Sequence, residues 1–456
     1  MEREDLLLEV RAHLEEHRLI AIRMLLAEAQ PIDIAELLAE VSPEERLLVY
    51  RLLPKETAAE VLVQMTHENR RDLVAAFSDY ELARVLDELY ADDTVELLEE
   101  MPANFVRRIL KNCSSDHRRA VNLLLRYPEG SAGSIMTTEY VRLSADMTVE
   151  EALSHIREVA IDKETVYTCY VTDRSRVLLG IVTARMLLIS PLTMRVGDLM
   201  EEHIVTVETH EERESVARLL DRYKFLALPV VDKDGRLVGI ITVDDAMEVI
   251  SEEVEEDFAK MAAMVPTDRP YLQETPFKIF LTRIPWLLLL MIGATFTGLI
   301  IASFENALSR LVVLTAFIPM LMGTGGNSGS QASVTVIRGL SLGELTPRHI
   351  WSVLFKELRV SFLCGIVLGV VNFGKVLLVD GLLFGNPEVN VRVSLAVSAS
   401  LAVTVVAAKL IGGLLPIAAR RVGLDPAVMA APFITTIVDA VSLLVYFSFA
   451  VALLGL

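Results

Sequence analysis

The chain has 456 residues, enough for several folding units, with 52% hydrophobic residues, a mean hydropathy of +0.44 and a formal net charge of −19. The charge is unevenly spread: residues 284–456 hold 10 Lys and Arg and 7 Asp and Glu, which leaves 33 basic and 55 acidic residues in 1–283. An acidic soluble part joined to an apolar part excludes a simple soluble enzyme. It also argues against nucleic acid as a partner, because phosphates need a basic surface. The composition favours a membrane protein whose soluble part meets cations.

The first segment, up to about residue 130, has a helical pattern. Apolar residues recur at spacings of three and four, as in IAELLAEV (34–41) and ETAAEVLVQM (56–65). Prolines such as Pro43, Pro54 and Pro102 suit the first turns of short helices. We expect an array of helical hairpins; an ordinary helical bundle is the alternative. The segment lacks the features of a secretory signal at its start, so we expect the N-terminus in the cytoplasm.

The next segment repeats itself. Residues 134–158 match 198–222 in the order of their elements, and 170–188 match 229–247. Each copy predicts a short strand, an amphipathic helix, an apolar strand, a turn, a second strand and a helix. This pattern resembles the cystathionine-β-synthase-like (CBS) domain pair, which commonly senses a ligand such as an adenine nucleotide.

The resemblance suggests which residues would hold a nucleotide. The second copy has Thr242 and Asp245 in the Thr-x-x-Asp position that often holds ribose and phosphate, whereas the first has Met186 in place of the acid. Arg185 and Phe225 resemble positions that contact adenine nucleotides in some pairs. A purely structural CBS pair remains the alternative.

Five apolar stretches follow, each long enough to cross a bilayer: 285–304, 311–338, 360–384, 393–418 and 428–455. The loops that carry an excess of Lys and Arg all fall on the side of the soluble part. The positive-inside rule therefore predicts a cytoplasmic N-terminal part and an external C-terminus.

Asp439 lies inside the fifth stretch, and an ionisable side chain there is a functional hypothesis by default. Thr435 and Thr436, four and three residues earlier, share its helical face. Hydroxyl, carbonyl and carboxylate oxygens suit Mg²⁺, which uses few carboxylates and keeps waters. A buried structural aspartate is the alternative.

The second stretch contains GTGGNSGSQA (323–332), which is too rich in glycine and amides to face lipid alone. Small residues allow close helix approach, and Asn327 and Gln331 can present amide oxygens toward a pore. Helix packing alone is the alternative.

The chain resembles the MgtE-type magnesium channel or transporter family in several features together. They are GTGGNSGSQA, PFITTIVDA (432–440), the five apolar stretches, the CBS pair and the acidic helical start. The resemblance covers the whole chain. It implies a multidomain membrane protein with an all-α N-terminal helical array (1–130), an α/β tandem CBS pair (131–253), a connecting helix (246–275) and a five-helix transmembrane domain (280–456). It further implies a homodimer in the cell inner membrane, with Asp439 of each protomer facing Mg²⁺ in a pore.

The family resemblance also gives the acidic residues a role. In the family that the chain resembles, such carboxylates bind Mg²⁺ between domains and hold the closed state when cytoplasmic Mg²⁺ is high, and the resemblance implies the same role here. The residues implied by position are Asp92, Asp93, Glu212, Glu214, Asp245, Glu248, Glu253, Glu256, Asp257 and Asp425. A solvated acidic face without a site is the alternative.

Two other functions are alternatives. A CBS-regulated carrier for another divalent cation or solute is the main alternative, since oxygen ligands alone do not exclude Co²⁺, Mn²⁺ or Ni²⁺. An intramembrane hydrolase is disfavoured, because the apolar stretches contain no histidine and Asp439 has no second acid as a partner. Lys409, inside the fourth stretch, would weaken the ion site if it paired with Asp439.

Overall fold

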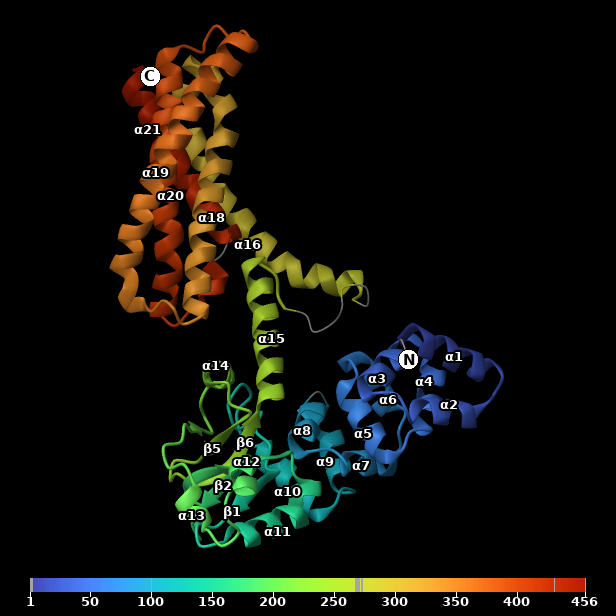
Figure 1. Cartoon of the computed structure of the whole chain (residues 1–456). Helices are drawn as coiled ribbons and strands as arrows, with labels where there is room; N and C mark the ends of the chain where they lie inside the picture. Colours follow the sequence, from blue (N-terminus) through green and yellow to red (C-terminus); the bar gives the residue numbers. More distant parts are fainter. Residues whose placement is uncertain (1–2, 100, 267–270, 272–273, 430, 456) are drawn as a thin grey trace. The chain divides into compact units, whose positions relative to one another are not determined.

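The structure, a computed structural model, describes residues 3–99, 101–266, 271, 274–429 and 431–455 (Figure 1). It divides into two compact units, Met1–Glu253 and Val254–Leu456. The division falls inside one helix.

The first unit begins with short helices. They are α1 (Arg3–Glu15), α2 (Leu19–Leu26), α3 (Pro31–Glu40), α4 (Pro43–Arg51), α5 (Lys55–Gln64), α6 (His67–Ala75), α7 (Asp79–Leu86), α8 (Ala91–Glu99), α9 (Ala103–Leu110) and α10 (Ser115–Leu124). Helices two positions apart in the chain pack on each other, from α1 on α3 to α7 on α9, and α8 packs on α10. This is the packing of an array, as the sequence predicts.

Local sequence fixes where several of these helices begin. Ser42 and Ser78 each form a capping box with a glutamate three residues on. Pro43 is the first residue of α4, as expected. Pro54 and Pro102 instead lie one residue before α5 and α9, in extended conformation.

The rest of the first unit contains the two predicted repeats. The first copy comprises β1 (Tyr140–Leu143), α11 (Val149–Val159), the 3₁₀ turn Ala160–Asp162, β2 (Thr165–Thr172), β3 (Leu178–Thr183) and α12 (Ala184–Ile189). After α13 (Val196–Leu199), the second copy comprises β4 (Val207–Glu208), α14 (Arg213–Tyr223), β5 (Ala227–Val231), β6 (Leu237–Thr242) and α15 (Val243–Met261). The element order matches the prediction.

Each copy forms a three-stranded sheet. The first two strands are parallel and the last two antiparallel, in the orders β1-β2-β3 and β4-β5-β6. The two copies meet through a small core that includes Tyr170, Leu237 and Ile240. A larger core runs from the N-terminal helices into the second copy, where it includes Val216, Leu220 and Leu228. This shared core brings α8 to the first turns of α15.

The second unit is helical. After the end of α15 it contains α16 (Pro276–Ser303), α17 (Glu305–Arg310), α18 (Ile318–Ser341), α19 (Ile350–Lys375), α20 (Val391–Arg421) and α21 (Ala431–Leu454). Short 3₁₀ segments precede α18, α19 and α21, and a π-helical segment, Val376–Leu383, extends α19.

Four helical segments in the described part of the chain are long and apolar enough to cross a membrane. They are Pro276–Ser303, Pro347–Leu383, Val391–Arg421 and Ala431–Leu454. The chain is thus built as a multi-pass membrane protein. With 24 residues, α18 is long enough to cross as well, but glycines and hydroxyl side chains make it less apolar than the other four. That α18 also crosses the membrane remains a prediction.

Candidate functional site

The glycine-rich segment of α18 has two different faces. Gly325, Gly326 and Gly329 are buried, and a Cβ atom on Gly329 would lie 2.9 Å from Cγ2 of Ile434 on α21. A Cβ on Gly412 of α20 would lie 2.1 Å from the carbonyl oxygen of Gly329, so these backbones approach closely. Helix packing, the alternative interpretation of this segment, therefore accounts for Gly325, Gly326 and Gly329.

The amide residues of the same segment are on the other face. Asn327 and Gln331 are exposed in the single chain, whereas their neighbours Ser328 and Ala332 are buried. A row of exposed amides on a helix that is packed within an apolar bundle is costly in lipid, since each amide needs a partner there. The exposed face of α18 is thus available to line a polar path.

Asp439 is half-buried in α21, about 12 Å along the helix from its start at 1.5 Å per residue. Within the described residues it has neither a hydrogen bond nor an ion pair. The hydroxyls of Thr435 and Thr436 both donate to the carbonyl oxygen of Pro432, at 2.9 and 3.0 Å, so their oxygens keep lone pairs free to accept. Thr435 packs against Gly326, which puts it level with Asn327 on α18.

Lys409 is 6% exposed on α20, in a different helix from Asp439. Residues of α20 on the face of Lys409 contact α19: Ala402 lies against Gly365, and Gly413 lies against Glu357. The face next to it, with Ala408, packs on α21. No ion pair of Lys409 occurs in the described part of the chain, so the structure gives no support for a pair with Asp439.

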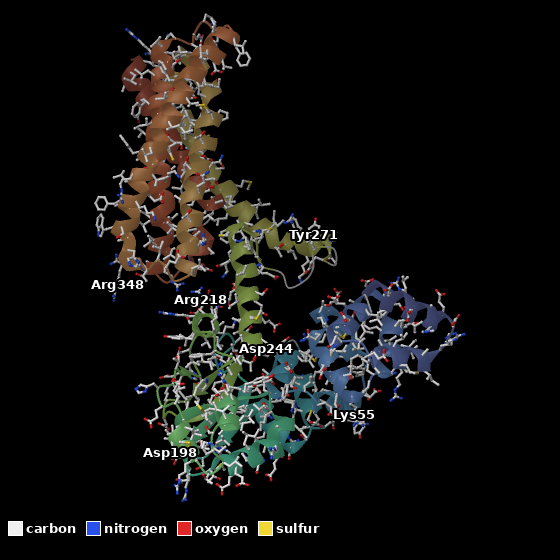
Figure 2. The ribbon with its side chains drawn as sticks, in the orientation of Figure 1. Lys55, Asp198, Arg218, Asp244, Tyr271 and Arg348 are labelled. Atoms are coloured by element: carbon white, nitrogen blue, oxygen red, sulfur yellow. The ribbon has the colours of Figure 1, made fainter. Side chains whose placement is uncertain are left out.

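The first unit gathers acidic residues of two elements that are far apart in the sequence. Asp92 and Asp93 lie in the first turn of α8, and Asp245 and Glu248 lie near the start of α15, where Figure 2 labels Asp244. Burial, together with Glu96 and Asp245, raises the pKa of Asp93 to about 7. Burial raises the pKa of Asp245 to about 6, against the opposing effect of its hydrogen bond from Thr242. The predicted set on α8 and α15 is therefore brought together.

Glu164, between the turn Ala160–Asp162 and β2, also belongs to this cluster, and the sequence did not indicate it. Burial, followed by the charges of Asp245 and Asp93, raises its pKa to about 8. One carboxylate oxygen of Glu164 (Oε2) and one of Asp92 (Oδ1) are buried without a hydrogen-bond partner. Buried, unpartnered carboxylate oxygens of like charge are unfavourable unless a proton or a cation compensates them.

The acids are nevertheless not arranged as a finished coordination shell. Among the residues described, no three His, Cys, Asp or Glu side chains converge closely enough to hold a metal ion. An ion that keeps several of its waters, as Mg²⁺ does, would meet such a cluster through those waters. The donor set of hard carboxylate oxygens fits Mg²⁺.

A second acidic group surrounds Arg213. Glu212, Arg213 and Glu253 line a cavity of about 280 Å³ together with Glu129. The guanidinium of Arg213 lies 2.9 Å from Glu252 and 3.4 Å from Glu253. Glu214, also predicted as a ligand, instead forms an ion pair with Arg218 one turn further along α14 (Figure 2).

A third group lies in the second unit, at the end of α15. Lys260 Nζ lies 2.5 Å from Glu256 Oε1 and 2.6 Å from Asp425 Oδ2. Burial lowers the pKa of Lys260, but its hydrogen bonds to both carboxylates outweigh burial and raise it overall. Asp257 accepts a hydrogen bond from Ser341 Oγ at 3.1 Å. Three predicted ligands thus have partners within the chain.

The residues suggested for a nucleotide differ in their exposure to solvent. Thr242 is buried, and its hydroxyl donates to Asp245 Oδ2 at 2.5 Å, so the Thr-x-x-Asp pair is closed on itself. Phe225 is partly buried and stacks on Tyr223, and Arg185 is exposed. Asp245 is shared between the nucleotide and metal predictions.

Comparison with protein families gives three matches along the chain. Residues 318–449 match the model described as MgtE divalent cation transporter, and residues 29–130 match the MgtE intracellular N domain. The CBS domain model matches twice, at 132–191 and 196–252. The first match contains Asp439 and the glycine-rich segment.

Relatives and solved structures agree. The chain is 38% identical over 416 residues to the magnesium transporter MgtE of Thermus thermophilus, covering 90% of each chain, and 32% identical to that of Bacillus subtilis, covering 90% and 91%. It is similar to the crystal structure of the cytosolic domain of the Mg²⁺ channel MgtE in complex with ATP, with 39% identity and a TM-score of 0.51 over 53% of this chain and 99% of that one. The soluble part of a magnesium transporter gives a TM-score of 0.53 at 29% identity, over 55% and 99%.

Proposed function

This chain belongs to the MgtE family of divalent cation transporters, and we propose that it conducts Mg²⁺ across a membrane along a path that passes Asp439. The single observation that carries the proposal is the position of this carboxylate. It lies inside a membrane-spanning helix, half-buried and without a partner in the described chain, within the region matched by the family model. An unpaired acid at that depth needs a cation or water beside it.

The rest of the path is proposed from the polar side chains near Asp439. Thr435 and Thr436 add hydroxyl oxygens, and Asn327 and Gln331 add amide oxygens on the exposed face of α18. We propose that two copies of the chain form a homodimer in which these faces meet, so that two Asp439 carboxylates attract one divalent ion. Mg²⁺ would pass with most of its waters, held by hydrogen bonds from water to these oxygens.

The acidic clusters are proposed as the regulatory part. Mg²⁺ on the cytoplasmic side would bind to the carboxylates of α8 and α15 and to those near Glu212 and Asp425, and its binding would favour the closed state. Support comes from the buried, unpartnered oxygens of Asp92 and Glu164, whose repulsion a divalent ion removes. Moving a gate from 1:99 to 99:1 takes about 5.5 kcal/mol of differential binding, which a few such ions supply.

We further propose that the N-terminal and CBS domains lie in the cytoplasm of a cell whose inner membrane holds the helices. The supporting observation is the distribution of basic residues within the second unit. Arg348, and with it the ends of α18 and α20 that carry Arg338 and Arg420, lie at the end of the bundle opposite to the C-terminus (Figures 1 and 2). Basic residues favour the cytoplasmic side.

An adenine nucleotide is proposed as a modulator bound by the CBS pair. It is supported by the solved cytosolic domain of a relative in complex with ATP. Thr242 and Asp245 would hold the ribose and phosphate, after their mutual hydrogen bond opens. We assign no catalytic role to any residue.

The direct test is ion flux into liposomes that hold the purified full chain, with Mg²⁺ on the cytoplasmic face varied. The proposal predicts that the flux of Mg²⁺ decreases as the Mg²⁺ concentration on the cytoplasmic face rises. Flux of Co²⁺ or another ion with no flux of Mg²⁺ would instead favour a carrier for a different divalent cation. The absence of any flux of divalent cations would contradict the proposal.

A further inference from the structure

The last turn of α15 holds an ammonium group between two carboxylates that were expected to bind a metal ion. Lys260 Nζ is 2.5 Å from Oε1 of Glu256, on the same helix, and 2.6 Å from Oδ2 of Asp425, in the connection between α20 and α21. The three side chains are between 26% and 39% exposed, so the group is partly shielded from water. A cation that belongs to the chain thus sits between the two acids.

The surroundings keep this arrangement in place. The other oxygen of Asp425, Oδ1, accepts the backbone N–H of Ala427 at 2.8 Å, which orients the carboxylate. Met261 packs against Ile337 and Ala427. The ammonium is therefore positioned by the fold of the second unit, rather than by a flexible surface contact.

Charge at this group is only partly balanced. Glu256 and Asp425 together carry two negative charges, and Lys260 carries one positive charge. The carboxylate of Asp257 is also repelled by the charge of Asp425. A divalent ion between the two carboxylates would balance both. It cannot occupy that position together with the ammonium, because the two cations repel each other at contact distance.

We propose that Lys260 is a tethered competitor of the regulatory divalent cation at Glu256 and Asp425, and that it sets the Mg²⁺ concentration at which this site fills. The inference rests on the proposed function, in which Mg²⁺ binds these carboxylates. At low Mg²⁺ the ammonium ties the end of α15 to the α20–α21 connection. At high Mg²⁺ the ion displaces the ammonium and makes the same connection with a higher charge.

Competition and simple support predict opposite effects when Lys260 is replaced. If Lys260 competes, Lys260→Met removes the competitor, and Mg²⁺ fills the site at a lower concentration. If Lys260 only supports the end of α15, the same variant loosens this helix and raises the Mg²⁺ needed to order it. Lys260→Arg keeps the charge, so competition predicts a midpoint at or above the native value.

The test is hydrogen–deuterium exchange of the purified full chain in detergent, measured by mass spectrometry over a range of Mg²⁺ concentrations. The readout is the Mg²⁺ midpoint of protection in peptides covering 250–262, which is independent of transport. Lys55→Met is the matched control, because Lys55 is an exposed lysine on α5 in the first unit (Figure 2). For Lys260→Met we expect the midpoint to fall by about threefold to tenfold, tenfold being ~1.4 kcal/mol of binding free energy.

Two results would overturn the inference while leaving the proposed function intact. In both, Mg²⁺ protects the native chain. In the first, the Mg²⁺ midpoint of Lys260→Met equals the native midpoint, and in the second it is higher than the native midpoint. A native chain in which no peptide of either unit gains protection with Mg²⁺ would overturn both the inference and the proposed regulation.

Discussion

At the scale of single residues, glycines of the helical bundle differ sharply in what surrounds them. A Cβ atom on Gly412 would lie 2.1 Å from a backbone oxygen of α18, whereas a Cβ on Gly323 would meet nothing within 4 Å. Within the GTGGNSGSQA segment, a Cβ on Gly329 would lie 2.9 Å from Cγ2 of Ile434, so the glycines of this segment do not share one role. Some allow α18, α20 and α21 to approach, and Gly323 leaves open space.

This contrast gives a prediction about stability. Gly412→Ala should destabilise the folded bundle by about 1–3 kcal/mol, because the clash with the carbonyl of Gly329 forces two backbones apart. Gly298→Ala on α16, where a Cβ also meets nothing within 4 Å, is the matched control and should leave stability unchanged or slightly raised, since alanine is the better helix former. Thermal unfolding of the purified chain in detergent measures both. Equal melting temperatures for the two variants would contradict the packing described.

Basic residues partner several of the predicted acidic ligands in the structure. Arg213 pairs with Glu252 and Glu253, and Lys260 bridges Glu256 and Asp425. The sequence indicated the acids of these groups but not their partners. Lys260 and Asp425 are 165 residues apart, and nothing in the local pattern links them.

At the scale of elements, the repeat of strands and helices could be predicted because it depends on local periodicity. The order β1-α11-β2-β3-α12 recurs as β4-α14-β5-β6-α15, as the two matched segments indicate. Membrane helices could be predicted from length and hydropathy for the same reason. The second apolar stretch is the exception, since the polar face of α18 lowers its hydropathy.

The participation of Glu164 could not be predicted, because it depends on how three elements pack. Glu164 precedes β2 in the first CBS copy, Asp92 is on α8 and Asp245 is on α15. Their separation in sequence is large, and only the shared core of the first unit brings them together. No spacing rule connects such residues.

The acidic cluster predicts how stability depends on pH when divalent ions are removed. The pKa values of Asp93 and Glu164 are raised to about 7 and about 8 by burial and neighbouring acids. The folded chain therefore holds protons that the unfolded chain has already released, and its free energy of unfolding falls as pH rises from about 5 to about 8. Mg²⁺ compensates the same charges, so the fall should be smaller when Mg²⁺ is present.

Thermal unfolding of the full chain, in chelator and in Mg²⁺ over this pH range, measures the effect. Glu164→Gln should flatten the decrease seen in chelator, because it removes one acid with a raised pKa. Glu202→Gln, at an exposed position of the same unit, is the matched control and should behave as the native chain. A decrease of equal size with and without Mg²⁺ would argue against a metal at this cluster.

At the scale of the whole molecule, the exposed amides of α18 are an argument for the proposed homodimer. Asn327 and Gln331 are open in the single chain, although the bundle around them is apolar. Meeting the same face of a second copy would give them water or an ion instead of lipid. This is the physical argument for a dimer, which the sequence pattern alone did not provide.

The dimer gives a prediction that cross-linking can check. A chain with Gln331→Cys should form a covalent dimer under mild oxidation in the membrane, because in the proposed homodimer the α18 faces of the two copies meet near the path. Phe362→Cys, at an exposed apolar position on α19, serves as the control and should cross-link far less. Equal cross-linking at both positions would contradict a dimer that meets along α18.

The role of Asp439 in the ion path is tested most sharply by comparing Mg²⁺ flux for two substitutions of the same kind. Asp439→Asn removes the charge within α21. Asp380→Asn removes the charge of an aspartate in the segment that follows α19, where its Oδ2 lies 2.7 Å from Lys375 Nζ. We predict that Asp439→Asn lowers flux into liposomes by about tenfold or more, since the ion loses its carboxylate, while Asp380→Asn retains most of the native flux. Native flux in Asp439→Asn, with the protein folded and inserted, would contradict the assignment of Asp439 to the ion path.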